Sequence, residues 1–280
     1  NIYMISLIKT YICGCVRNVA PYLCEVFQNI DNIITSVDDY TIIMSYDDSD
    51  DASLNILQSL QQKYGEKMII IIGNTPLTDT RTQNISNARN RIMDKIRELN
   101  NSEFEYFIML DTDDVCSKPI NIDVLNYIWN KEKTTPLLWD ALTFNRSKYY
   151  DLWALSIYPY SFSCFHYPRT RLIRNKMHTH IQNLLRDTGK KYGNNGLLEC
   201  FSAFNGFGIY RVSKFKNINY EWNIHKLLEI IPKENITTMS NSVLQTPFMR
   251  EDDCEHRYFH IRASQMNQAR ICISPMYLFY

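Results

Sequence analysis

The amino-acid sequence predicts an α/β fold in which helices flank a central, mainly parallel β-sheet. Through the first half, apolar runs of strand length alternate with segments that carry apolar residues at helical spacing. Strands that alternate with helices pair in parallel through right-handed crossovers. Several of the apolar runs end in acidic residues. The carboxyl ends of parallel strands are where such folds bind ligands, so this pattern also predicts a site.

Four strands are expected in the first half, each a short run rich in β-branched or aromatic residues. They span residues 10–16, 40–46, 67–72 and 104–110. The third is almost entirely isoleucine, so we expect it to be buried on both faces of the sheet.

Three helices are expected in the connections between these strands. The first begins near Pro21, because proline suits the first turn of a helix, and the second ends near Gly65. Their apolar faces consist, in order, of Leu23, Phe27, Ile30 and Ile34; of Leu54, Leu57, Leu60 and Tyr64; and of Ile85, Ile92, Ile96 and Leu99.

Length and composition limit the class of protein. The chain has 280 residues, of which 45% are hydrophobic, so it can bury a substantial core. Lysine plus arginine and aspartate plus glutamate are equal at 30 each. A nucleic-acid-binding protein would normally carry a basic excess, so we expect no nucleic-acid partner. With no repeat or linker, residues 1–280 are expected to form a single domain.

The eight cysteines are scattered and contain no C-x-x-C pair. This pattern predicts neither a disulfide framework nor a zinc site, and it favours a reducing, cytoplasmic compartment. No apolar run approaches the roughly 18 residues of a membrane span, and the beginning of the sequence lacks the features of a signal peptide. We therefore expect no membrane span.

The most informative segment is the end of the fourth predicted strand, where Asp111, Asp113 and Asp114 follow an apolar run. Clustered carboxylates repel one another, and a bound cation relieves that repulsion. Oxygen ligands select hard ions such as Mn²⁺ or Mg²⁺. The alternative for an isolated D-x-D is a solvated acidic turn.

The ends of the first two predicted strands place Arg17, Asp47 and Asp48 on the same rim as Asp111, which favours a nucleotide site. Asp50 and Asp51 have an alternative role, because they can cap the following helix. No P-loop and no G-x-G-x-x-G motif is present.

Phosphate binding must therefore come from a metal ion and arginine. Among the arginines of the third predicted helix, one aimed at the rim could pair with a carboxylate or a phosphate. Arg91 or Arg97 is expected to point into solvent.

A late segment, residues 250–260, contains four acids and two histidines. If it is helical, His256 and His260 share one face. The H-x-x-x-H spacing lacks the glutamate of the zinc-protease motif. His260 is more consistent with a packed or surface histidine, whereas His256 remains a candidate metal ligand.

Six segments in order resemble those of a GT-A glycosyltransferase: residues 12–18, 45–53, 87–90, 110–114, 203–211 and 253–256. More narrowly, they are similar to the mannosyltransferase-like, capsule-associated enzymes of fungi and large DNA viruses. The resemblance implies a Rossmann-type sandwich with a nucleotide-sugar-binding half, about 1–115, and an acceptor-side half, about 116–280. A viral origin would imply the host cytoplasm or the virion.

The resemblance also implies roles for individual residues. Asp111 and Asp113 would bind Mn²⁺ or Mg²⁺, which bridges the diphosphate of the donor. Asp47 or Asp48 would meet the base or ribose, and Arg89 would contact the donor. On the acceptor side, Glu255 or Asp253 would act on the acceptor hydroxyl, and His256 would complete the metal shell.

The expected function is transfer of a hexose from a UDP- or GDP-sugar to a hydroxyl of a glycan or glycoprotein. If the reaction inverts configuration, Glu255 or Asp253 is the general base; if it retains configuration, these residues orient the acceptor. Two alternatives remain: a nucleotidyltransferase acting on sugar phosphates, and an inactive glycan- or partner-binding module. Formation of a homodimer is left open.

Overall fold

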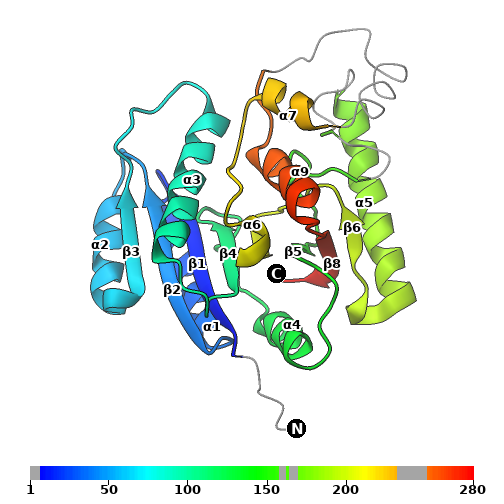
Figure 1. Ribbon diagram of the computed structural model, residues 1–280, viewed down its shortest axis with the longest axis horizontal. Helices are drawn as coiled ribbons and strands as arrows, with labels where there is room; N and C mark the ends of the chain where they lie inside the picture. Colours follow the sequence, from blue (N-terminus) through cyan, green and yellow to red (C-terminus); the bar gives the residue numbers. More distant parts are fainter. Residues whose placement is uncertain (1–6, 158–161, 164–169, 232–250) are drawn as a thin grey trace.

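A computed structural model of the chain describes residues 7–157, 162–163, 170–231 and 251–280 (Figure 1). Eight strands of these residues form one sheet. They are β1 (Lys9–Val16), β2 (Asp39–Tyr46), β3 (Met68–Ile72), β4 (Tyr106–Asp111), β5 (Ala141–Asn145), β6 (Leu198–Cys200), β7 (Phe207–Arg211) and β8 (Ile271–Tyr277).

The strands lie in the order β3-β2-β1-β4-β7-β5-β8-β6. The pairs β3–β2, β2–β1, β1–β4 and β5–β8 are parallel. Strand β7 runs antiparallel to β4 and β5, and β6 runs antiparallel to β8. The predicted fold class, an α/β fold with a mainly parallel central sheet, is confirmed. One sheet thus contains strands from both predicted halves of the chain.

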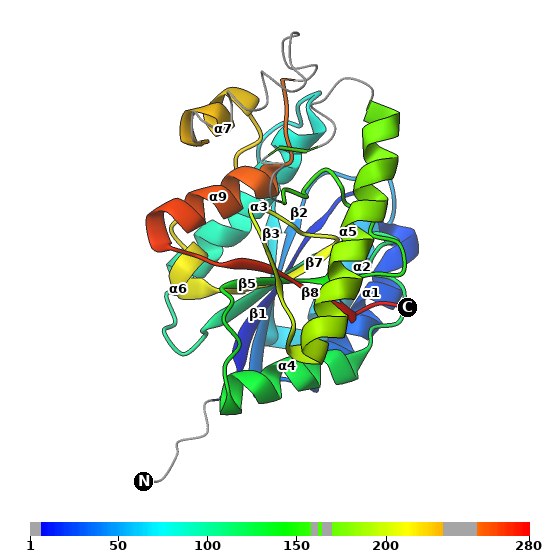
Figure 2. The ribbon, with the colours of Figure 1, turned by 90° about the vertical axis from the view of Figure 1, so that its right-hand side faces the viewer.

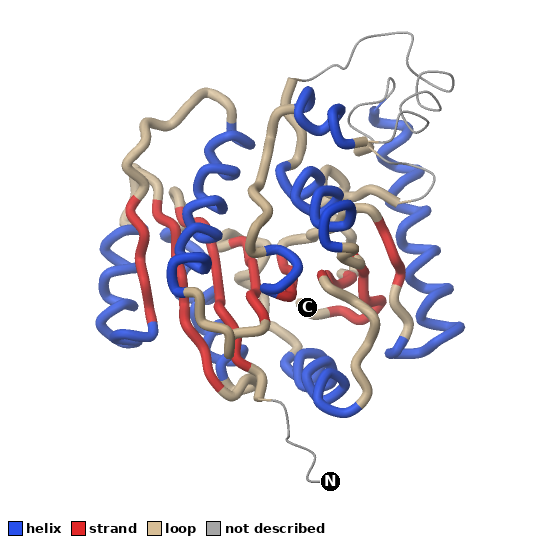
Figure 3. Tube along the Cα trace, viewed as in Figure 1, coloured by secondary structure: helices blue, strands red, loops and turns tan. Residues whose placement is uncertain are grey.

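Helices cover both faces of this sheet (Figures 2 and 3). On one face α1, α2 and α4 pack against it, and on the other α3, α6 and α9 do so. The helices are α1 (Ala20–Ile34), α2 (Ser53–Tyr64), α3 (Arg81–Leu99), α4 (Ile122–Thr134), α5 (Thr170–Tyr192), α6 (Val212–Phe215), α7 (Ile224–Ile230) and α9 (Glu255–Asn267), with short 3₁₀ turns at Gly65–Lys67 and Gly193–Asn195.

The alternation of side chains along β1 explains the two layers. Ile12 belongs to the core beneath α1 and α4, whereas its neighbours Tyr11 and Cys13 belong to the core beneath α3 and α9. Successive side chains of a strand point to opposite faces, so an uninterrupted apolar run supplies both cores at once. None of the helices in the described part of the chain is long and apolar enough to span a membrane.

The expectation for the third predicted strand is wrong. Strand β3 is the outermost strand of the sheet and pairs only with β2. Met68 is buried, but the isoleucines that follow are only partly buried, and Ile72 is 55% exposed. An edge strand has a neighbour on one side only, so a run of isoleucines does not by itself show that a strand is central.

We predict opposite outcomes for two isoleucine substitutions. Ile12→Ala, at a position with 0% exposure, should lower the free energy of unfolding by about 2–5 kcal/mol, because it leaves a cavity in the central strand. Ile72→Ala should change it by less than about 0.5 kcal/mol. Urea denaturation of both variants checks this, and equal losses would contradict the strand order.

Candidate functional site

The carboxyl ends of β1, β2 and β4 surround a pocket. Because these strands are parallel and in register, Cys15 of β1 lies opposite Asp111 of β4. We call this cavity, of about 190 Å³, the rim pocket. It is lined by Cys15, Val16, Arg17, Val19, Asp47, Arg81, Asn84, Ile85, Ala88, Arg89, Asp111, Thr112 and Asp113. Asp48 is exposed beside it, and its carbonyl accepts a hydrogen bond from Arg17 Nε at 3.4 Å.

A second cavity, of about 220 Å³, adjoins the first and leads toward α9; we call it the α9 pocket. It is lined by Arg81, Thr82, Ile85, Arg89, Asp111, Asp113, Tyr150, Asp151, Trp153, Phe204, Cys254, Glu255 and His256. Both pockets share Arg81, Ile85, Arg89, Asp111 and Asp113. Each is smaller than a typical ligand pocket, but together they approach that size.

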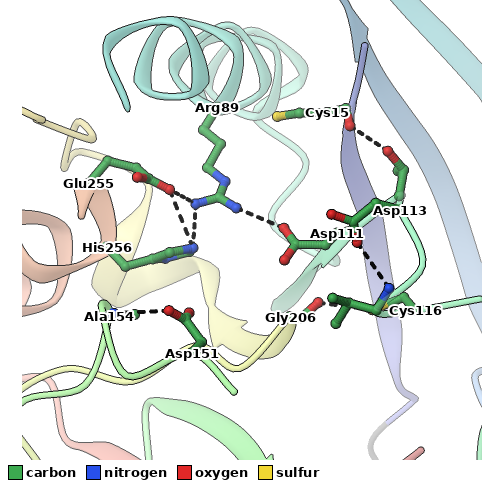
Figure 4. A network of polar contacts seen from close by, with 12 residues as sticks. Cys15, Arg89, Asp111, Asp113, Cys116, Asp151, Ala154, Gly206, Glu255 and His256 are labelled. Carbon is green, nitrogen blue, oxygen red and sulfur yellow. Dashed lines mark hydrogen bonds and ion pairs between the residues drawn. The ribbon is translucent and has the colours of Figure 1, made fainter. Parts of the chain in front are cut away.

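The buried side chain of Arg89 lines both pockets. Figure 4 shows it between Asp111 on one side and Glu255 and His256 on the other. Its Nη2 donates to Asp111 Oδ1 at 3.1 Å, and its Nη1 donates to Glu255 Oε1 and contacts His256 Nε2. The guanidinium also lies 4.8 Å from the centre of the Phe204 ring. One cation therefore joins α3, β4 and α9, and it is the arginine for which the resemblance implies a donor contact.

The carboxyl of Asp111 is costly to ionise in this position. Burial raises its pKa from 3.8 to about 7, even though Arg89 acts in the opposite direction. Its other oxygen, Oδ2, accepts a hydrogen bond from the Tyr150 hydroxyl at 2.9 Å. Burial also raises the pKa of Asp113, whose Oδ1 accepts the backbone N–H of Val115 at 3.1 Å. Both carboxyls would thus be stabilised by a further cation.

A tight turn fixes the position of Asp111. Its backbone N–H donates to the Gly206 carbonyl at 2.9 Å, and Gly206 has a φ of 86°. A Cβ atom on Gly206 would lie 2.4 Å from a methyl group of Val115. Only glycine allows this approach. The segment 203–211, which begins with the residues A-F-N-G, is therefore hydrogen-bonded to the end of β4 through Gly206.

Three charged residues in or near the rim pocket, Arg91, Asp47 and Asp51, have structural partners. Arg91, one of the two arginines expected in solvent, instead donates to Asp47 Oδ1 at 2.5 Å and to Ser45 Oγ at 3.0 Å. That expectation is wrong for Arg91, because a carboxylate of the neighbouring strand lies within its reach. Asp51 accepts the backbone N–H groups of Ala20 and Ser53, so it ties the starts of α1 and α2 together.

The structure separates the two acids proposed for the acceptor side. Asp253 is buried and accepts from Arg257 Nε at 2.7 Å, and Arg257 has no exposed surface. Arg257 also donates to Ser156 Oγ and to the Trp153 carbonyl. In the described residues, Asp253 lines neither pocket, whereas Glu255 lines the α9 pocket. Of the two acids, only Glu255 therefore has its side chain at a pocket.

The two histidines of α9 stack on each other, with ring centres 5.5 Å apart. Burial lowers the pKa of His260 to about 3, and its ring nitrogens contact Ser202 and Tyr210. Burial also lowers the pKa of His256, whose Nδ1 has no hydrogen-bond partner among the residues that the structure describes and whose Nε2 faces Arg89. Burial thus favours the neutral form of both rings, and His260 is a packed histidine.

The residues present fit a divalent cation in part. Within the described ranges, no group of three or more histidine, cysteine or acidic side chains is arranged to hold a metal ion. Mg²⁺, however, is often held by one or two carboxylates together with water and substrate phosphates. Asp111 and Asp113 provide such a pair. The Nε2 atom of His256 is directed at Arg89, which makes His256 a poorer candidate.

Sequence reasoning missed Asp151. It lies in a connection without helical or strand periodicity, so no pattern singles it out. Its Oδ1 accepts the Ala154 N–H at 3.0 Å and its Oδ2 accepts the Asn205 N–H at 3.3 Å. Burial raises its pKa.

Asp253→Asn tests whether that acid is structural. The substitution removes the negative partner of Arg257 and leaves that arginine buried without a counter-charge. We therefore expect the free energy of unfolding to fall by about 3–5 kcal/mol. Asp94→Asn is the matched control, because it breaks an exposed Asp–Arg pair, worth at most about 1 kcal/mol. Thermal and urea denaturation measure both. A stable Asp253→Asn variant would restore Asp253 as a catalytic candidate.

The raised pKa of Asp111 makes stability depend on pH. Between pH 3.8 and about 7, the native state keeps a proton that the unfolded state has lost. This proton contributes its full amount to the free energy of unfolding below this pH window. The contribution falls as pH rises through the window, by up to about 1.4 kcal/mol per pH unit. Asp111→Asn should therefore gain stability relative to the wild type as pH rises. Urea denaturation across the window measures this difference, and a constant difference would contradict it.

No known family model matches the sequence, and no curated protein matches it. Among solved structures, TarS 1–349 of S. aureus has 14% identity and a TM-score of 0.47, with 98% of this chain and 60% of that chain covered. The same protein in complex with UDP-GlcNAc has 12% identity and a TM-score of 0.49, with 98% of this chain and 58% of that chain covered. The mannosyltransferase PcManGT from Pyrobaculum calidifontis, in complex with GDP-Man and Mn²⁺, has 11% identity and a TM-score of 0.40. The match covers 76% of this chain and 47% of that chain. The chain thus spans less than two thirds of each of these chains, and it is assigned to no family by them.

Proposed function

We propose that the protein is a metal-dependent glycosyltransferase that moves a hexose from a UDP- or GDP-sugar to a hydroxyl of a glycan or glycoprotein. One observation carries this proposal. The two acids of the D-x-D segment line both pockets, so a donor diphosphate in the rim pocket would meet an acceptor in the α9 pocket at these carboxylates.

The rim pocket suits the nucleoside diphosphate. Arg17 and Arg81 supply positive charge at its edge, where no carboxylate forms an ion pair with them among the contacts of the described residues. Asp47 lies deeper and is fixed by Arg91, so its remaining acceptor capacity can meet a ribose hydroxyl or a base N–H. Asp48, which is exposed, is the alternative for this contact.

Asp111 and Asp113 would hold the divalent ion, with phosphate oxygens and water completing its ligands. When bound, Mn²⁺ or Mg²⁺ acts as a Lewis acid that stabilises the negative charge on the leaving diphosphate. Asp111 keeps its orientation through Arg89 and the Gly206 carbonyl. The chain thus positions the carboxylates in advance, which limits the reorganisation needed on binding.

Glu255 is the acid that faces the acceptor. Burial raises its pKa, and the opposing charge of Arg89 favours its ionised form. As a carboxylate it can accept the proton of an attacking hydroxyl if the reaction inverts configuration. If the reaction retains configuration, the same carboxylate orients that hydroxyl.

Asp113→Ala tests the proposed metal site. The carboxyl is partly exposed in both pockets, so the fold should remain, whereas Mn²⁺-dependent binding of UDP or GDP should weaken by at least about tenfold. Calorimetric titration of each nucleotide with and without Mn²⁺ measures this. Asp94→Ala, on the exposed surface of α3, serves as the control. Unchanged nucleotide affinity in Asp113→Ala, with the metal present, would refute the assignment.

A further inference from the structure

We infer that the α9 pocket takes an uncharged polyhydroxyl acceptor, a sugar unit without a phosphate or carboxylate next to the reacting hydroxyl. This inference rests on the proposed function and adds the chemical class of the acceptor. It follows from the charged residues in the part of the α9 pocket that the rim pocket does not share.

That part, which we call the acceptor wall, contains two acids and three aromatic rings. Its residues are Thr82, Tyr150, Asp151, Trp153, Phe204, Cys254, Glu255 and His256. Within the described ranges, the wall has no lysine or arginine, and burial favours the neutral form of its one histidine, whose pKa is lowered. The wall therefore contains two acidic side chains, of which Glu255 is already paired with Arg89.

The nearby arginines do not offset this charge for a ligand. Arg89 is already shared among Asp111, Glu255 and His256. Arg257 is completely buried and paired with Asp253 behind the wall. Arg81 lines both pockets at their junction, where the donor phosphates are expected. A phosphate or carboxylate on the acceptor would face Asp151 and Glu255 without a cation of its own.

Asp151 is built to accept hydrogen bonds from an acceptor. Its carboxylate is held by the backbone N–H groups of Ala154 and Asn205, so its orientation is fixed before a ligand arrives. Each carboxylate oxygen can accept a second hydrogen bond, and a sugar hydroxyl can donate one. A phosphate monoester that has lost its protons cannot donate, and it is also repelled.

The aromatic residues of the wall complete the match to a sugar. Tyr150 is 40% exposed, with its hydroxyl bonded to Asp111, and Trp153 lines the same cavity. An aromatic ring offers apolar surface to the C–H groups of a sugar, while the acids bind its hydroxyls. Such a combination of apolar surface and a few placed polar groups is typical of specific ligand sites.

The test measures sugar binding to the protein that is saturated with Mn²⁺ and UDP or GDP. The probes are the methyl glycosides of mannose, glucose and galactose, and the 6-phosphates of the same hexoses. We expect at least one neutral glycoside to bind, and each phosphate to bind at least about tenfold more weakly than that glycoside at low salt. Ligand-detected NMR and calorimetry give these affinities.

Asp151→Asn tests the origin of the discrimination. It removes the charge and keeps the size, although one of the two oxygens that accept backbone N–H groups becomes an NH2 group. The ratio of affinities for neutral and phosphorylated sugars should fall by at least about threefold, without a change in nucleotide affinity. Asp94→Asn is the matched control. If Asp151→Asn does not fold, added salt gives the same information in the wild type, because screening should improve binding of the phosphates only.

Three results would overturn the inference. The first is binding of phosphorylated sugars as tight as that of neutral ones, and the second is no binding of any neutral glycoside. The third is a ratio of affinities for neutral and phosphorylated sugars that neither Asp151→Asn nor added salt changes. Failure of the proposed function gives a different result. In that case UDP and GDP would not bind with Mn²⁺, while a preference of the protein alone for neutral sugars would still support the acceptor wall.

Discussion

The site depends on one interaction, the buried guanidinium of Arg89 between the carboxylates of Asp111 and Glu255. These residues come from α3, β4 and α9, and Arg89 and Glu255 are 166 residues apart in sequence. A buried charge is tolerated only when it is paired and hydrogen-bonded. The same contact therefore joins the parallel part of the sheet to the late helix, and Arg89 lines both pockets.

Arg89 does not neutralise its surroundings. Around it lie four carboxyls, those of Asp111, Asp113, Asp151 and Glu255, and burial raises the pKa of each. A bound cation would lower the cost of ionising these carboxyls. A divalent ion bound together with a diphosphate would do this on the donor side. On the acceptor wall, hydrogen bonds from neutral hydroxyls would stabilise the ionised carboxyls without adding charge.

The sequence predicts the parallel sheet and the acidic rim, because both depend on local patterns. Apolar runs define strands, and the residues after Val16, Tyr46 and Leu110 must meet once those strands are parallel. The edge position of β3 is not encoded locally, since it depends on the strand order. Nor could the sequence choose between Asp253 and Glu255. They are two residues apart, and both are buried and paired with an arginine, Asp253 with Arg257 and Glu255 with Arg89. Only the three-dimensional structure shows that Glu255 lines the α9 pocket. Asp151 lies outside any periodic segment, and its position depends on the Asn205 turn.

The central claim is that Asp111 and Asp113 together hold a divalent ion that grips a diphosphate. A crystal structure of the protein with Mn²⁺ and a UDP- or GDP-sugar, with anomalous data at the manganese edge, tests it most directly. The account predicts an anomalous peak between these two carboxylates, bonded to diphosphate oxygens, with Arg89 still joined to Glu255. A nucleotide sugar bound elsewhere, with no peak at these carboxylates, would contradict the account.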